Sequence, residues 1–269
     1  MILQTVLCDL DGVVWLGGVP IFGSVEAVAK LRQAGVRVVF VSNSSAPTIA
    51  EHTAALAAIG IVADGDVISS STAAAELIEP GERVLVCGGP GVVEAVLAAG
   101  ATPLSGDDEA AVAAGVDVVV AGLHRTFDYE RLRLATAAIR GGARFVATNR
   151  DPLFPTPAGP IPGGGSIVAS IATATGVEPE TAGKPHEPMV RAVHRLLGDQ
   201  ADPATLVVIG DQLSTDGRFA ESLGCRFGIV RTGNTPPGVA VEPRPDLDGP
   251  DLAAVVRTLL APAGSAPPG

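Results

Sequence analysis

Two aspartates stand one residue apart directly after an apolar run at the start of the chain. Asp9-Leu10-Asp11 follows residues 1–8, and Gly12 comes next. Alternate side chains of a strand lie on the same side, and glycine lets the chain turn at once, so both carboxylates can face one small site. Taken alone, this spacing favours a solvated Asp-Gly turn. The chemical interpretation depends on the rest of the chain.

A second apolar run, residues 38–41, ends in a cluster of hydrogen-bonding residues, Ser42, Asn43 and Ser44. They offer hydroxyl, amide and backbone N–H donors to an anion. Such a segment by itself is more often a loop and a helix cap. Open α/β sheets bind ligands at the carboxyl ends of their strands, so the position of this segment matters as much as its composition.

Two further segments add charges at predicted element ends. Residues 207–210 lead into Asp211, and Asp216 lies five residues on, close enough in a tight loop to support the same site. Lys184 precedes a helix that we expect to begin near Glu187, where it can place a point charge beside the helix start. The combined set of acids, serine and lysine at element ends is improbable by chance. Its oxygen ligands suit Mg²⁺.

Composition limits the classes of function. The 269 residues carry a net charge of −11, with no block of Lys and Arg, so nucleic acid is an unsuitable partner. An acidic chain that binds an anion must gather positive charge locally, through a metal, a lysine or helix N-termini. Three widely spaced cysteines indicate reduced core thiols, and with no signal or membrane segment we expect a cytoplasmic protein with no membrane partner.

Short β-branched runs alternate with Ala-rich helical stretches, which predicts an α/β fold with Rossmann-like parallel sheets. The predicted strands are Thr5–Asp9, Arg37–Ser42, Val67–Ser69, Arg83–Cys87, Val116–Ala121, Arg144–Ala147, Leu206–Ile209 and Arg226–Val230. The predicted helices are Ser24–Ala34, Thr48–Ile59, Ser71–Ile78, Gly91–Ala99, Tyr129–Gly141, Ser166–Thr175, Pro188–Leu197 and Thr215–Leu223. The helical spacing around His52 predicts that its side chain lies on a helix surface.

These motifs resemble the four motifs of the haloacid dehalogenase superfamily of aspartyl-phosphate-forming hydrolases, and they occur in the same order along the chain. The matching segments are residues 9–13, Ser42-Asn43, Gly183-Lys184-Pro185 and Gly210-Asp211 through Asp216. About 140 residues separate the second and third motifs, where one branch of the superfamily inserts an α/β cap. Residues 148–155 and 162–166 look like the cap of phosphoglycolate, pyridoxal phosphate and 4-nitrophenyl phosphate phosphatases.

The resemblance implies a role for each residue. Asp9 would be the nucleophile that forms the aspartyl phosphate, and Asp11 would act as the acid and then the base. Ser42 and the backbone of Asn43 would hold the phosphoryl oxygens, with Ser44 beside them, and Lys184 would neutralise them. Mg²⁺ would lie between Asp9, the backbone carbonyl of Asp11 and Asp211, with Asp216 binding through water or bracing Lys184.

Domain boundaries follow from the motif positions. Residues 1–72 and 179–261 would form a discontinuous Rossmann-like catalytic core, residues 73–178 the cap that selects substrate, and residues 262–269 a disordered tail. The superfamily also implies a homodimer through the cap. Phe154 takes a cap position where pyridoxal phosphate phosphatases carry a substrate-binding histidine; it could stack on a flat ligand, and packing is the preferred interpretation.

The predicted function is Mg²⁺-dependent hydrolysis of a small phosphomonoester, such as a sugar phosphate, glycerol phosphate or phosphoglycolate. A phosphotransferase or phosphomutase would use the same aspartyl phosphate, and a non-catalytic relative would bind a phosphorylated ligand. A phospho-aspartate receiver domain is about half this length and lacks the large insertion. A dehalogenase is disfavoured, because Asp11 has no group to protonate when a halide leaves.

Overall fold

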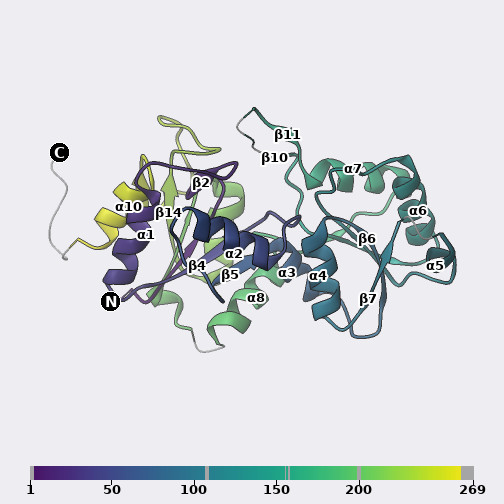
Figure 1. Cartoon of the computed structure of the whole chain (residues 1–269). Helices are drawn as coiled ribbons and strands as arrows, with labels where there is room; N and C mark the ends of the chain where they lie inside the picture. The colour runs from purple at the N-terminus through teal and green to yellow at the C-terminus, as the bar shows by residue number, and fades with distance from the viewer. Residues whose placement is uncertain (1–2, 107–108, 155, 157, 199–200, 262–269) are drawn as a thin grey trace. The chain divides into compact units, whose positions relative to one another are not determined.

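The computed structural model describes residues 3–106, 109–154, 156, 158–198 and 201–261, and the predicted tail at 262–269 lies outside the described residues. The chain forms two compact units. The first comprises Met1–Val41, Ala55–Asp66 and Gln200–Gly269, and the second Ser42–Ala54 and Val67–Asp199. Figure 1 traces both units along the chain.

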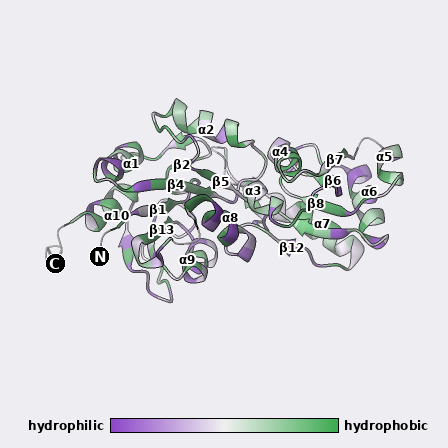
Figure 2. Cartoon of the chain, turned by 90° about the horizontal axis from the view of Figure 1, so that it is seen from below, coloured by the Kyte–Doolittle hydropathy of each residue, from purple (hydrophilic) through white to green (hydrophobic). Residues whose placement is uncertain are grey.

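The first unit is built on a parallel sheet with strand order β15-β14-β13-β1-β4. Its strands are β1 (Thr5–Cys8), β4 (Arg37–Ser42), β13 (Leu206–Gly210), β14 (Arg226–Val230) and β15 (Leu247–Gly249). In this register Cys8 lies opposite Ile209 on one side and Phe40 on the other. The sequences of β1, β4 and β13 are almost wholly apolar, as Figure 2 shows, because helices cover both faces of a parallel sheet.

Helices and a hairpin complete the first unit. The hairpin joins β2 (Trp15–Leu16) to β3 (Val19–Pro20), and the helices are α1 (Ser24–Gln33), α9 (Arg218–Leu223) and α10 (Leu252–Leu259). Helices α1 and α10 pack together, and α9 packs against β13 and β14. A 3₁₀ turn, Pro203–Thr205, precedes β13, and a π-helical turn, Leu213–Gly217, leads into α9. Helix α2 (Ile49–Ala58) begins in the second unit and ends in the first.

The second unit contains another parallel sheet, with strand order β12-β9-β8-β6-β7. The strands of this sheet are β6 (Arg83–Cys87), β7 (Thr102–Ser105), β8 (Val118–Ala121), β9 (Arg144–Ala147) and β12 (Glu180–Thr181). The bounds of the second unit also include β5 (Val67–Ser69), which is not a strand of this sheet, and the hairpin of β10 (Leu153–Phe154) with β11 (Ile161–Pro162). Its helices are α3 (Ser70–Ala75), α4 (Pro90–Ala98), α5 (Glu109–Ala113), α6 (Tyr129–Arg140), α7 (Gly164–Thr175) and α8 (Glu187–Leu197). A core of buried, mainly aliphatic side chains joins the sheet to α6 and α7.

The predicted α/β class with parallel sheets is confirmed, and the eight predicted strands are all present within two residues of their predicted ends. Strands β7, β12 and β15 and both hairpins were not predicted, because each is short and carries no alternating or apolar run. Helix α10 was also missed; the Asp251 side chain caps it by accepting a hydrogen bond from the Ala254 N–H over 2.8 Å. The bounds of the two units differ from the bounds predicted for the core and the cap. The predicted bounds therefore stay a prediction.

The interpretation of His52 as a surface residue was wrong. Its side chain is 4% exposed, and a ring nitrogen lies 3.3 Å from the carbonyl oxygen of Ser44. Burial lowers the pKa of His52 below its ordinary value, although the contact with Ser44 and the charges of Glu51 and Glu94 act in the opposite direction. A histidine on one turn of an Ala-rich helix gives no sequence signal for burial, because the same spacing fits either face.

Candidate functional site

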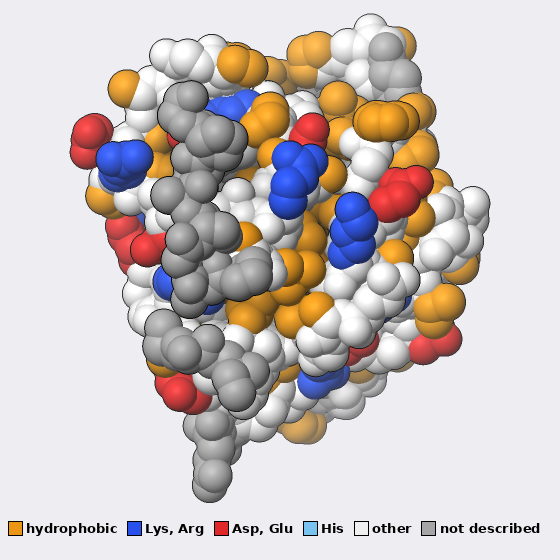
Figure 3. All heavy atoms as spheres, turned by 90° about the vertical axis from the view of Figure 1, so that its left-hand side faces the viewer, with side chains coloured by type: hydrophobic (Ala, Val, Ile, Leu, Met, Phe, Trp, Pro, Cys, Tyr) orange, Lys and Arg blue, Asp and Glu red, His pale blue; other side chains and the backbone are white. Residues whose placement is uncertain are grey.

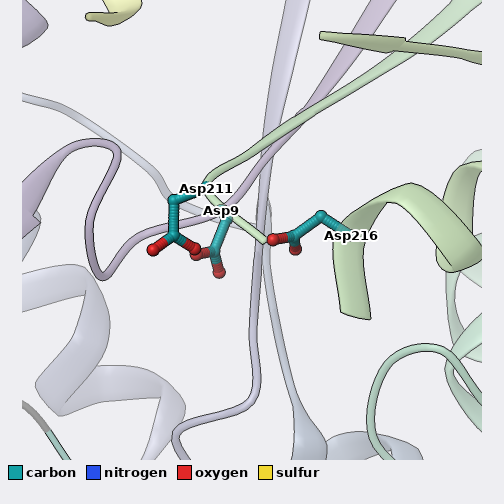
Figure 4. Close-up of side chains that lie close together, drawn as sticks. All are labelled: Asp9, Asp211 and Asp216. Carbon is teal, nitrogen blue, oxygen red and sulfur yellow. The ribbon is translucent and has the colours of Figure 1, made fainter. Parts of the chain in front are cut away.

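Three aspartates of the first unit form a compact group that we call the acid cluster: Asp9, Asp211 and Asp216. One carboxylate oxygen from each lies within 4.8 Å of the others, and Figure 4 shows the three side chains directed toward one another. Asp9 follows β1 and Asp211 follows β13, which are adjacent in the sheet, and the Asp9 N–H donates to the Ile209 carbonyl over 2.9 Å. The carboxyl ends of two parallel strands therefore bring together residues about 200 positions apart.

The acid cluster is suited to a divalent cation. Asp9 is 9% exposed, Asp211 3% and Asp216 1%, so three negative charges share a site with little access to water. Like charges at such distances repel strongly unless a cation offsets them. Mg²⁺ binds oxygen ligands at about 2.1 Å in octahedral geometry, so ligands on opposite sides are about 4.2 Å apart. Three carboxylate oxygens within 4.8 Å of one another are close enough for one such ion to draw them together.

Glycines allow the main chain to approach these carboxylates closely. Gly12 has a φ of +85°, in the left-handed region, and a Cβ at this position would lie 2.6 Å from Asp211 Oδ2. A Cβ on Gly210 would lie 2.1 Å from the carboxyl carbon of Asp216, and one on Gly233 would lie 2.0 Å from Asp211 Oδ2. The cluster can form only because these three positions have no side chain.

The π-helical turn after β13 directs Asp216 back toward the sheet. Its Oδ2 accepts hydrogen bonds from the Gln212 N–H over 3.2 Å and from the Thr215 hydroxyl over 3.4 Å. Single turns of π-helix are rare and are frequently found at functional sites. Asp216 therefore lies close to Asp211, as predicted, because of a type of turn that the sequence did not indicate.

Sequence reasoning missed the segment Thr232–Asn234, which follows β14. Asn234 donates to Asp211 Oδ2 with its main-chain N–H and, over 2.9 Å, with its Nδ2. Thr232 donates its hydroxyl to the Gly12 carbonyl over 2.5 Å. Strand β14 was predicted, and its carboxyl end is the same kind of position that pointed to Asp11 and Asp211, so this position was the signal that could have found the segment.

The side chain of Asp11 is not part of the acid cluster that the described residues form. Its Oδ1 accepts a hydrogen bond from Trp15 Nε1 over 3.1 Å, and its main chain bridges to Trp15 at the start of the β2–β3 hairpin. This fits the expectation that Asp11 would offer a metal its backbone carbonyl and keep its carboxylate for proton transfer. The role itself stays a prediction.

The second unit carries the remaining predicted residues. Ser42 is 2% exposed and its Oγ accepts from the Ser44 N–H over 3.0 Å. Asn43 Oδ1 accepts from the Lys184 N–H over 2.8 Å, so the structure brings together two of the predicted motifs that lie 141 residues apart. Lys184 itself is 5% exposed. Phe154 lies on β10, partly buried and opposite Ile161 in the β10–β11 hairpin.

The cysteines lack the features of reactive groups. None of the three forms a disulfide in the part of the chain that the structure describes, Cys8 and Cys87 are buried, and burial raises the pKa of Cys87 to about 12 and that of Cys225 to about 11. Thiolates, and not thiols, are the nucleophiles, so Cys87 and Cys225 are inert near neutral pH. Among the residues that the structure describes, no helix is long and apolar enough to cross a membrane.

Comparison with known proteins agrees with this geometry. Residues 6–102 match a family model described as haloacid dehalogenase-like hydrolase, and residues 181–255 match one described as HAD-hydrolase-like. The D-glycerol 3-phosphate phosphatase of Mycobacterium tuberculosis is 38% identical over 259 residues, covering 93% of this chain and 70% of that protein. The chain belongs to the haloacid dehalogenase-like hydrolases. The resemblance found in its motifs is thereby confirmed.

Other members of the haloacid dehalogenase-like family give the same result. An acid sugar phosphatase of Staphylococcus saprophyticus is 37% identical, over 78% of this chain and 79% of that protein. A crystal structure of the Mycobacterium tuberculosis glycerol phosphate phosphatase in complex with magnesium superposes with a TM-score of 0.82 at 37% identity, covering 94% of this chain and 77% of that one. This chain is accordingly an enzyme of a hydrolase family whose named relatives are phosphatases.

Proposed function

We propose that this enzyme is a Mg²⁺-dependent phosphatase that hydrolyses a small phosphomonoester through an aspartyl phosphate on Asp9. The observation that carries the proposal is the acid cluster at the ends of β1 and β13, three nearly buried carboxylates with the spacing of one cation site. The names of the relatives support the substrate class, because one is a D-glycerol 3-phosphate phosphatase and another an acid sugar phosphatase.

The proposed reaction has two steps. In the first, a carboxylate oxygen of Asp9 attacks phosphorus, the ester oxygen leaves, and Asp11 protonates it. In the second, Asp11 removes a proton from water, which attacks the phosphorus of the aspartyl phosphate and releases inorganic phosphate and the Asp9 carboxylate. Asp11 has the opposite protonation state at the start of each step, so one residue serves both.

Positive charge is essential to this chemistry, because a carboxylate and a phosphate dianion repel each other. Mg²⁺ held by Asp9, Asp211 and the Asp11 carbonyl, with Asp216 beside it, would offset charge on both reactants. Lys184 supplies a further charge, and Ser42, Asn43 and Ser44 supply hydrogen-bond donors for the phosphoryl oxygens. Catalysis in this account is positioning and charge stabilisation.

Residues 73–178 form the proposed cap. We assign to it the selection of substrates by size and the exclusion of bulk water, and Phe154 is its candidate contact with the substrate. A homodimer through this cap and a cytoplasmic location remain part of the proposal. Large phosphoproteins are expected to be poor substrates.

The proposal is tested by inorganic phosphate release across glycerol 3-phosphate enantiomers, sugar phosphates, phosphoglycolate and 4-nitrophenyl phosphate, each with Mg²⁺ or with EDTA. We expect release from several small esters with Mg²⁺ and none with EDTA. Release that is equal with Mg²⁺ and with EDTA contradicts the metal dependence. Transfer of the phosphoryl group to a second sugar, without free phosphate, identifies a phosphotransferase. Binding of esters with no turnover identifies a non-catalytic relative.

A further inference from the structure

One asparagine of the second unit connects three segments that are far apart in the chain. Asn43 directly follows β4, and its polar atoms make five hydrogen bonds: to Lys184 (two), Asp151, Asn149 and Ser70. Its side chain uses both its acceptor and its donor group. The role implied by the family resemblance concerned only the Asn43 backbone.

Two of these bonds hold the peptide groups of Lys184. Asn43 Oδ1 accepts from the Lys184 N–H over 2.8 Å, and Asn43 Nδ2 donates to the Lys184 carbonyl over 3.3 Å. The side-chain amide thus pairs with the main chain of Lys184 on both sides of its Cα, as a neighbouring strand would. The position and direction of the Cα–Cβ bond of Lys184 are therefore set by Asn43.

The preceding glycine permits this pairing. A Cβ on Gly183 would lie 2.6 Å from Asn43 Oδ1 and 2.6 Å from the Thr148 carbonyl oxygen. The Gly183 N–H donates to that same carbonyl over 2.7 Å. Any side chain at position 183 would push Lys184 away from Asn43.

The remaining bonds fix Asn43 itself. Its Nδ2 also donates to Asp151 Oδ2 over 3.1 Å, and its main-chain carbonyl accepts from Ser70 Oγ over 2.6 Å and from Asn149 Nδ2 over 2.7 Å. Both protons of the amide have an acceptor and the backbone is held from two sides. These contacts require a planar group with one acceptor and two donors. Asparagine has such a group, whereas aspartate, leucine and alanine do not.

We propose that the side chain of Asn43 is a positioning residue for the reaction, which holds the main chain of Lys184 so that its ammonium group reaches the phosphoryl oxygens. This inference rests on the proposed function for the role of Lys184. Transition-state charge stabilisation depends on donors and charges placed in advance, and a displacement of about 1 Å can lower the rate 10²-fold.

The first test exchanges donor and acceptor without a change of shape. Asn43→Asp keeps an acceptor for the Lys184 N–H but places a second carboxylate oxygen against Asp151 Oδ2 and the Lys184 carbonyl. In the double variant Asn43→Asp/Asp151→Asn, the donor and the acceptor change sides. We expect kcat to fall about 100-fold in Asn43→Asp, with a smaller change in KM, and the double variant to regain at least about tenfold.

The second test does not require activity. The sequence contains two lysines, Lys30 and Lys184, so the holoenzyme labelled with [¹³Cε]-lysine gives one signal for each. We expect Asn43→Asp to shift the Lys184 signal and leave that of Lys30, on α1, in place. A shifted Lys184 signal with partial rescue supports the proposal. An unshifted Lys184 signal, or a kcat that Asn43→Asp leaves unchanged, overturns it.

The two tests separate failure of this inference from failure of the proposed function. If the wild type releases no phosphate from any ester, the proposed function fails, and the lysine signals still decide whether Asn43 positions Lys184. If the wild type is active but Asn43→Asp is as active and its Lys184 signal is unmoved, the positioning role alone is wrong.

Discussion

Asn234 donates two hydrogen bonds to one oxygen of Asp211, from its main-chain N–H and from its side-chain Nδ2. Two donors occupy the lone pairs of Oδ2 and fix the plane of the carboxylate, so coordination of a cation through Oδ1 is favoured. Asn234 is exposed while Asp211 is 3% exposed, so a surface side chain orients a buried metal ligand.

Removal of the Asn234 amide is expected to weaken metal binding. Because Asn234→Ala loses one of the two donors and keeps the main-chain one, we expect the Kd for Mg²⁺ to rise about tenfold, the lower end of the range for residues that orient metal ligands. Titration calorimetry with Mg²⁺ measures this. Gln212→Ala is the matched control, since that amide donates to Ser214 Oγ and not to the acid cluster. Equal Kd values for wild type and Asn234→Ala would contradict the role.

Lys184→Ala is expected to lower kcat/KM by about a thousandfold, because a preorganised charge on the transferring group is lost while the main-chain pairing with Asn43 remains. Steady-state kinetics with 4-nitrophenyl phosphate measures the loss. Lys30→Ala removes the other lysine, exposed on α1, and should leave the rate unchanged. Similar losses in both variants would show that Lys184 has no special role.

The sequence predicted the acid cluster because strand ends are visible in it. Asp9 and Asp211 each follow an apolar run, and parallel strands align such ends at one edge of a sheet. The Thr232–Asn234 segment follows β14 and could have been found by the same rule, but its bonding partners could not, because no local pattern encodes the bond from Thr232 to Gly12, 220 positions away. The same holds for β12 and the two hairpins, whose two-residue strands exist only through their partners.

On the face seen in Figure 3, Lys and Arg side chains lie among Asp, Glu and hydrophobic ones. The burial of His52 was not predicted, because α2 is so rich in Ala that its helical spacing does not distinguish an inner from an outer face.

Stability is expected to fall in acid because of His52. Its pKa is lowered by burial, so below about pH 6.5 the unfolded chain binds a proton that the folded chain does not. The free energy of unfolding should therefore fall as pH decreases through this range, by at most about 1.4 kcal/mol per pH unit from this group. Urea denaturation of wild type and His52→Gln at several pH values measures the slope. An identical slope in both proteins would contradict the assignment.

Asp11→Asn is expected to separate the two proposed steps. A 4-nitrophenolate ion leaves without protonation, so the first step should proceed, whereas the second step lacks its base. Rapid mixing should show a burst of one equivalent of nitrophenolate, with a gain of one phosphoryl group on Asp9 by mass spectrometry. The hydrogen bond from Trp15 can still be accepted by the asparagine oxygen, so the fold should persist. A uniformly slow reaction without a burst would contradict the assignment of Asp11 to the second step.

The most direct test of the account compares Mg²⁺-dependent phosphate release by the wild type and by Asp9→Asn, with a small ester such as glycerol 3-phosphate. The substitution keeps the size of the side chain at the end of β1 and removes the nucleophilic carboxylate. We expect metal-dependent release by the wild type and a loss of more than about 10⁴-fold in Asp9→Asn. Comparable release by both proteins would show that Asp9 is not the nucleophile and would contradict the proposed mechanism.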